Sequence, residues 1–134
     1  MTPPPGAVDL LIVGRGGAAL AAWEYAASVG AVAGRVREAE AVLCPLPGGW
    51  EVAGQGARAV LLAGPRALAI WQAAGGAVVV NPVLGRGVPV PGALPGVEVA
   101  GAGLGVEGAP ARAKSGRFRA RKLLRALARL DSGA

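Results

Sequence analysis

Apolar residues in this chain come in short runs that stop at glycine or proline. Residues 8–13 form a continuous apolar run interrupted only by Asp9, and residues 17–29 consist mainly of alanine and other good helix formers. A short apolar run favours a buried strand, whereas the longer alanine-rich run favours a helix. We therefore predict a strand over 8–13 and a helix over 17–29. Gly30 would end the helix, since glycine accepts the left-handed conformation.

The same alternation continues further along the chain. Residues 57–63 have the composition of a buried strand, and residues 77–80 that of another. Between them, residues 65–74 read as a helix with Pro65 in its first turn. Strands that alternate with helices predict an α/β fold with a parallel sheet covered on both faces.

Other segments are less regular. Residues 39–43 fit either a strand or a short helix, and residues 45–49, rich in Pro and Gly, are expected to form a loop. Residues 83–96 predict an irregular crossing segment, followed by a last short strand over 97–101. The apolar residues 31–33 lead into 34–37 without a clear strand of their own.

The C-terminal stretch has a helical pattern and carries most of the charge. Apolar residues fall on one face and basic residues on the other, which predicts a basic amphipathic helix over 111–134. We expect its apolar face to pack on the sheet and its cations to face water, with docking to a partner subunit as the alternative. The apolar face comprises Ala120, Leu123, Leu124, Leu127 and Leu130. Residues 1–7 would be a flexible start and 8–110 the main domain.

Composition narrows the chemistry. The 134 residues suffice for one domain, and they include no histidine, which excludes imidazole catalysis and makes a metal site unexpected. The one cysteine, Cys44, cannot form an internal disulfide and is expected to be buried, so a cytoplasmic location is the default. No apolar run reaches the ~18 residues that a membrane span needs.

The net charge of +6 resides in the C-terminal stretch, which holds eight of the 14 basic residues. Without them the rest of the chain is nearly neutral, so the high pI does not by itself indicate a nucleic-acid-binding domain. Aromatic residues in the stretch stop at Phe118. Nucleic acid is therefore not an expected partner. The eight are Arg112, Lys114, Arg117, Arg119, Arg121, Lys122, Arg125 and Arg129.

The main candidate for chemistry is the turn Gly14-Arg15-Gly16 between the first strand and the first helix. Such a turn presents backbone N–H groups to a phosphate, and the helix start adds partial positive charge. The Arg15 guanidinium could pair with phosphate oxygens in a bidentate manner. Glu38 and Glu40 lie roughly where a classical dinucleotide fold has its ribose-binding acid.

An ordered series of motifs resembles the C-terminal, FAD-binding domain of the electron transfer flavoprotein alpha subunit. That family has a Gly-Arg-Gly turn after a strand, a G-A-x-x-G-x-S-R pattern, a Q-V-G-Q-T-G loop, a helix-opening motif and a strand ending at Asn. The order holds over roughly residues 8–100. The matching segments are Gly14-Arg15-Gly16, Gly30-Ala31-Val32-Ala33-Gly34-Arg35-Val36-Arg37, Glu51-Val52-Ala53-Gly54-Gln55-Gly56, Gly64 to Trp71, and Val78-Val79-Val80-Asn81.

The resemblance implies a three-layer doubly wound parallel sheet of the DHS-like NAD/FAD-binding type. It also implies FAD as cofactor and electron transfer as function, with the flavin reacting and the protein supplying orientation and field. By position, Gly14, Arg15 and Gly16 would lie at the phosphates and Arg37 over the flavin ring. The other implied contacts are Val52, Gly54, Gln55 and Gly56 under the ring or its linker, Trp71 near the ring edge, and Asn81 by the ribityl or adenosine part.

The chain also departs from the family pattern. The family's serine is Val36 here, its ring-contacting threonine is Gln55, and its histidine is Trp71. Losing several polar contacts, at about 1 kcal/mol or more each, would weaken FAD binding by orders of magnitude. Two alternatives therefore stay open: a module that binds AMP, NAD or another nucleotide, and a non-catalytic scaffold.

Partners and catalysis follow from the same resemblance and from the residues present. The resemblance implies a beta-like subunit as partner, with a homo-oligomer as the alternative, and the family's N-terminal domain has no counterpart among these residues. No nucleophile–base pair can be placed in the sequence, and independent catalysis is not expected.

Overall fold

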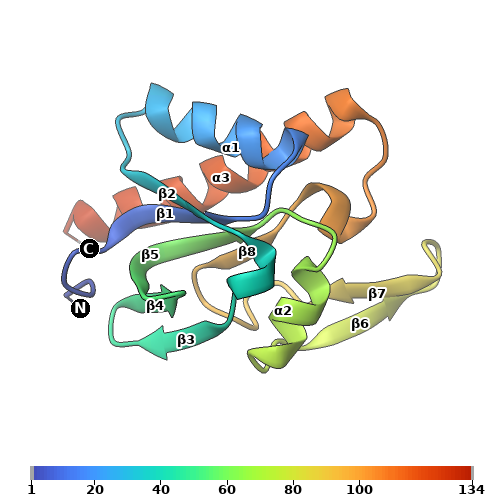
Figure 1. The fold of residues 1–134 in the computed structure, drawn as a ribbon, viewed down its shortest axis with the longest axis horizontal. Coiled ribbons are helices and arrows are strands. Elements are labelled where there is room, and N and C mark those ends of the chain that lie inside the picture. The colour runs from blue at the N-terminus through green and yellow to red at the C-terminus, as the bar shows by residue number, and fades with distance from the viewer. Residues whose placement is uncertain (1, 134) are drawn as a thin grey trace.

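The computed structural model describes residues 2–133 and is built around the strand β1 (Val8–Val13). β1 pairs in parallel with β2 (Ala33–Val36) on one side and with β5 (Gln55–Leu62) on the other. β8 (Val97–Val99) pairs in parallel with the second half of β5. The parallel strands thus have the order β2-β1-β5-β8, and the prediction of a mainly parallel α/β sheet is confirmed (Figure 1).

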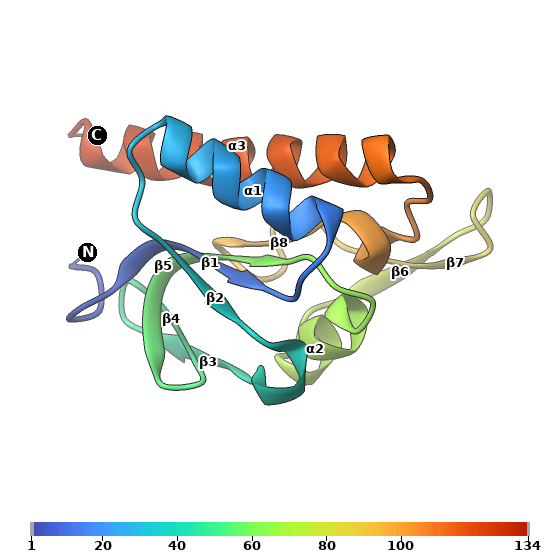
Figure 2. The same cartoon turned by 45° about the horizontal axis from the view of Figure 1, so that its top comes forward.

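Helices cover both faces of this sheet. On one face, α1 (Gly17–Ser28) and α3 (Ala109–Asp131) pack on Leu10 and Ile12 of β1. On the other face, α2 (Ala67–Ala73) packs on Leu11 and Val13. Successive side chains of a strand point to opposite faces, so the fully apolar end of β1 supplies both cores at once. Figure 2 shows α1 and α3 side by side above the sheet and α2 below it.

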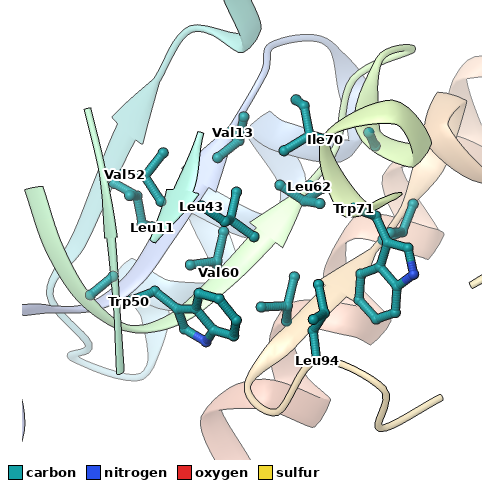
Figure 3. Packing of buried hydrophobic residues seen from close by; sticks show 14 residues of the cluster. Leu11, Val13, Leu43, Trp50, Val52, Val60, Leu62, Ile70, Trp71 and Leu94 are labelled. Carbon is teal, nitrogen blue, oxygen red and sulfur yellow. The ribbon is translucent and has the colours of Figure 1, made fainter. Parts of the chain in front are cut away.

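Two tryptophans anchor the core on the α2 side (Figure 3). Trp50 and Trp71 are buried, and each indole N–H still has a hydrogen-bond acceptor. Trp50 Nε1 donates to the carbonyl of Pro95 at 2.8 Å, and Trp71 Nε1 donates to the carbonyl of Ala77 at 2.9 Å. Both rings therefore contribute their large apolar area without the penalty of an unpaired polar atom.

The loop expected over 45–49 is limited to residues 47 and 48, which form the turn of a hairpin. β3 (Leu43–Leu46) and β4 (Gly49–Val52) pair antiparallel, and β4 continues the sheet beside the first half of β5. A proline can occupy β3 because this strand pairs only with β4 and its outer edge needs no N–H donor. Residues 38–40, just before the hairpin, form a short 3-10 turn (Glu38–Glu40).

A second hairpin stands apart from the main sheet. The strand predicted over 77–80 is present as β6 (Val78–Asn81), but it pairs only with β7 (Arg86–Pro89). It therefore does not extend the parallel sheet, and the segment 83–96 is not irregular throughout. The hairpin projects from the body of the protein (Figure 1). A 3-10 turn (Gly101–Leu104) links β8 to the loop before α3.

Glycine or proline lies near an end of each helix. α1 ends at Ser28, and Gly30 has the left-handed φ of 72° that was predicted for it. α2 begins only at Ala67, so Pro65 lies two residues before the helix and not in its first turn as expected. α3 begins at Ala109 with Pro110 in its first turn, slightly earlier than expected. No helix within residues 2–133 is both long enough and apolar enough to cross a membrane.

α3 packs on α1 with almost no space between their backbones. Gly116 of α3 lies so close to Ala18 of α1 that a Cβ on Gly116 would overlap the Ala18 carbonyl. Ala120 and Leu123 are buried in the same cluster, whereas Leu130 is 69 % exposed and lies outside the packed face. Small residues thus allow the two helices to lie in direct contact on one sheet face.

The far end of α3 is tied to the sheet by charge. Arg58 of β5 donates from Nη1 to Asp131 Oδ2 at 3.0 Å, and it also lies 3.5 Å from Asp9 Oδ1 of β1. The hydrogen bond from Arg58 holds the pKa of the Asp131 carboxyl below its ordinary value. Asp9 in turn accepts from the backbone N–H of Val32 at 2.9 Å, so the same cluster also secures the start of β2.

Replacing Gly116 with valine should therefore be costly. The added side chain must push α1 and α3 apart, and overpacking of this kind costs about 1–3 kcal/mol or more. Ala128→Val is the matched control, because it places the same β-branched residue at an exposed position of the same helix. Urea unfolding should show a lower midpoint for Gly116→Val and little change for Ala128→Val. Equal losses in the two variants would contradict the close packing.

Candidate functional site

The turn between β1 and α1 has the backbone that the sequence predicts for an anion-binding loop. Gly14 and Gly16 have φ of 107° and 109°, which side chains rarely tolerate. The N–H of Gly14 donates to the carbonyl of Val36 at 2.9 Å, which holds the turn against the end of β2. Space around Gly16 is open, and Arg15 is exposed between the two glycines. A ligand could therefore approach the backbone at Gly16.

A second turn lies directly against the first. The N–H of Ala63 donates to the carbonyl of Val13 at 2.9 Å, so β1 and β5 end together. A Cβ on Gly14 would lie 2.9 Å from the backbone nitrogen of Gly64. From here the chain enters α1 on one face and α2 on the other. In open α/β sheets, such a divergence at the carboxyl ends of the strands is where ligands bind.

Glu38 fills part of this junction. Its Oε2 accepts a hydrogen bond from the backbone N–H of Arg66 at 2.9 Å. Its carboxylate also lies against Gly64, where a Cβ would overlap it. Glu38 therefore bridges the end of β2 and the start of α2, and it brings a negative charge to the junction between the turns at Gly14 and Gly64. Glu40, the other acid considered from sequence, pairs instead with Arg37.

The amino ends of α1 and α3 meet at the same edge of the sheet. A Cβ on Gly17 would lie 3.8 Å from the carbonyl oxygen of Ala109 and 3.9 Å from Cβ of Arg112. Arg112 Nε in turn donates to the carbonyl of Val106 at 2.8 Å. The amino termini of two helices give this edge partial positive charge, and the exposed Arg15 in the turn adds a full positive charge. Glu38 offsets that charge only on the side of Gly64.

Some of the residues that the resemblance assigns to a flavin ring lie close together in the structure. Arg37, Ala53 and Gln55 line a shallow hollow of about 400 Å³ over the outer part of β2. The Gln55 amide donates to the carbonyl of Gly6 at 3.2 Å. Val52 is buried in the core, Gly54 belongs to the turn between β4 and β5, and Gly56 lies in β5 opposite Glu51. The structure therefore brings Arg37 and Gln55 together, with Val52 behind them.

Trp71 and Asn81 are placed away from the glycine turn. Trp71 is 1 % exposed and forms part of the core, so its ring offers no free face for stacking. Asn81 is in the projecting hairpin, where its Oδ1 accepts from the backbone N–H groups of Val83 and Leu84 at 2.9 and 3.1 Å. This is the geometry of a side-chain-stabilised turn, in which the asparagine has a local role.

A second hollow was not anticipated from sequence. It measures about 550 Å³ and lies between the β6–β7 hairpin and β8, with a mainly apolar lining that includes Val88, Val97 and Leu104. The sequence carried no signal for it, because its wall is a hairpin that was expected to be irregular.

Two further side-chain features bear on the chemistry. Cys44, expected to be buried, is exposed on the edge strand β3. Within residues 2–133 no group of three or more acidic, cysteine or histidine side chains is arranged to hold a metal ion.

Comparison of this chain with protein-family models, with curated proteins and with solved structures gives no match. The geometry of the crevice is therefore the basis for assigning a function.

The contact between Glu38 and Gly64 can be tested by a double-mutant cycle. Gly64→Ala should displace the Glu38 carboxylate and lose its hydrogen bond from Arg66, at about 1–2 kcal/mol of unfolding free energy. In the background of Glu38→Ala the same substitution should cost close to nothing, because nothing remains to displace. Thermal or urea unfolding of the four proteins measures the difference. A Gly64→Ala cost that is equal in both backgrounds would show that the two residues do not interact.

Proposed function

We propose that this protein is a nucleotide-binding module that holds the phosphate groups of its ligand at the turn Gly14-Arg15-Gly16. The observation that carries the proposal is the conformation and placement of the turn. Two glycines with positive φ, an exposed arginine and the start of α1 meet where β1 and β5 part toward opposite faces. The helices on both faces and the order β2-β1-β5-β8 favour a three-layer doubly wound fold, in which this crevice is the usual nucleotide site.

The position of Glu38 limits where a phosphate can lie. Two like charges in contact repel, so the phosphate would lie over Gly16 and Gly17, away from the Glu38 carboxylate near Gly64. There the phosphate oxygens would accept hydrogen bonds from backbone N–H groups at the start of α1, and they would pair with the Arg15 guanidinium. Sugar hydroxyl groups would face Glu38, since a carboxylate accepts hydrogen bonds from hydroxyls. A ligand with phosphate and ribose side by side fits this arrangement.

A flavin dinucleotide is the specific form of this proposal that the resemblance to the electron transfer flavoprotein alpha subunit favours. One geometric feature supports it. Val36 lines the same hollow as Arg37 and Gln55, and its carbonyl accepts the hydrogen bond from Gly14, so the hollow lies beside the glycine turn. FAD could then extend from the turn along the outer side of β2, with the Arg37 cation near the ring. In that case the protein would be an electron carrier, with a beta-like subunit or a second copy as partner.

The test is to titrate AMP, NAD and FAD into the protein by calorimetry and to repeat the titration with Arg15→Gln. We expect binding of at least one nucleotide, weakened about tenfold to a hundredfold in the variant, since a charge-assisted hydrogen-bond pair contributes about 1.5–3 kcal/mol. Arg129→Gln is the control, because this exposed arginine lies at the other end of α3.

The outcomes separate the candidates. FAD bound more tightly than AMP, and weakened by Arg37→Gln, would favour the flavin form. AMP or NAD bound as tightly as FAD would favour a general nucleotide site. A protein that binds none of the three at millimolar concentration would overturn the proposal and leave the scaffold interpretation.

A further inference from the structure

The outer face of α3 carries five cations that have no counterion. Two other cations of this helix, Arg119 and Lys122, share Glu98 of β8, at 2.9 and 3.5 Å. Of the other six, Arg112 donates to the carbonyl of Val106 at the start of the helix. The remaining five are exposed, and within residues 2–133 none of them forms an ion pair. No acidic residue occurs between 109 and 130. These five, called the cation row below, are Lys114, Arg117, Arg121, Arg125 and Arg129.

The cation row follows the side of α3 that is opposite its buried residues, and its member Arg125 also borders a hollow beside Tyr25 of α1. Its members are three or four residues apart, which places them on one side of a helix. Ala120 and Leu123 define the opposite side and are buried against α1 and the sheet. With a rise of about 1.5 Å per residue, neighbouring cations are about 4.5–6 Å apart along the axis. The row therefore presents a regular line of positive charge rather than scattered surface charges.

An exposed aromatic ring lies within the row. Phe118 is one residue from Arg117 and three from Arg121, and it is 59 % exposed. The Arg119 guanidinium carbon lies 5.5 Å from the centre of this ring, a cation–π contact that restrains it. A large apolar side chain kept in water beside unpaired cations has no role in the packing of α3. It is suited to stack against a flat ring of a ligand.

Two other partners fit this surface less well. An amphipathic helix binds a membrane by inserting its apolar face, but the apolar face of α3 is already used against α1 and β1. The centre of a protein interface is usually depleted in charged residues, whereas this face is dominated by like charges. A regular polyanion with exposed rings satisfies both the cations and the phenylalanine.

We propose that the outer face of α3 binds single-stranded nucleic acid, with backbone phosphates along the cation row and a base stacked on Phe118. Electrostatic grooves combined with aromatic stacking are the general means of binding single strands without sequence preference. The sequence alone did not suggest this partner, because the basic residues were expected to be simply solvated. The fold shows that Glu98 pairs with Arg119 and Lys122, whereas the cation row forms no ion pair within the described residues.

The experiment measures fluorescence anisotropy of a labelled 20-nucleotide oligothymidine with the full chain at several salt concentrations. Five phosphate contacts predict a slope of log K against log salt of about −3.5, and Arg117→Gln/Arg121→Gln should reduce it to about −2.1. At 50 mM salt the variant should bind about fiftyfold more weakly. Arg35→Gln/Arg66→Gln removes the same charge outside α3 and should leave the slope unchanged. Phe118→Ala should weaken binding about tenfold.

Several results would overturn the proposal. One is a wild-type protein that does not bind the oligonucleotide at 50 mM salt. Another is an equal loss in the two charge variants, which would mean that net charge alone is responsible. Binding to vesicles with 30 % phosphatidylserine, without binding to the oligonucleotide, would assign the row to a membrane. Tighter binding to a 20-base-pair duplex with no effect of Phe118→Ala would remove the stacking role.

Discussion

The parallel pairing of β1 with β5 is the constraint on which the candidate site depends. Five registered residue pairs join the two strands, from Val8 with Ala57 to Val13 with Leu62. Because both strands are buried, a slip of one residue would turn each apolar side chain toward the wrong core. The register therefore fixes the ends of the two strands relative to each other, and with them the turns at Gly14 and Gly64.

The same pairing explains why glycine is needed where the turns after β1 and β5 meet. The chain leaves β1 for α1 and β5 for α2, and the two turns approach so closely that a Cβ at Gly14 would meet the backbone of Gly64. A side chain at either position would close the junction. Glu38 occupies the inner part of the space that remains, and the outer part, around Gly16, stays open.

Sequence patterns predicted the elements whose apolar pattern matches their burial in the fold. β1, α1 and β5 were predicted because their apolar runs are long and lie next to glycine or proline. β8 has only three residues and was predicted as a short strand that follows Pro95 and Gly96. β2 and the β3–β4 hairpin were missed, since Arg35 and Pro45 interrupt their apolar pattern and both β2 and β3 are edge strands. Edge strands are held by backbone pairing to a neighbour, which leaves little trace in composition.

The candidate site was likewise predictable only in part. The glycine turn is a local feature, and the sequence was enough to expect it. The contact of Glu38 with Gly64 and Arg66 joins residues 26 or more positions apart in the chain, and no spacing rule reports such a meeting. Trp71 and Asn81 were assigned from a family pattern. In this chain the surrounding core and the β6–β7 hairpin determine their positions.

The central claim is that backbone amides at the start of α1 bind phosphate, and NMR of the amides tests it most directly. In a titration of ¹⁵N-labelled protein with ADP, the largest shift changes should fall on Gly16, Gly17 and Ala18. Changes at Gly64 and in the cation row of α3 should be smaller. If the changes are largest in α3, or if the amides of the turn do not move while ADP binds elsewhere, the account of the site is wrong.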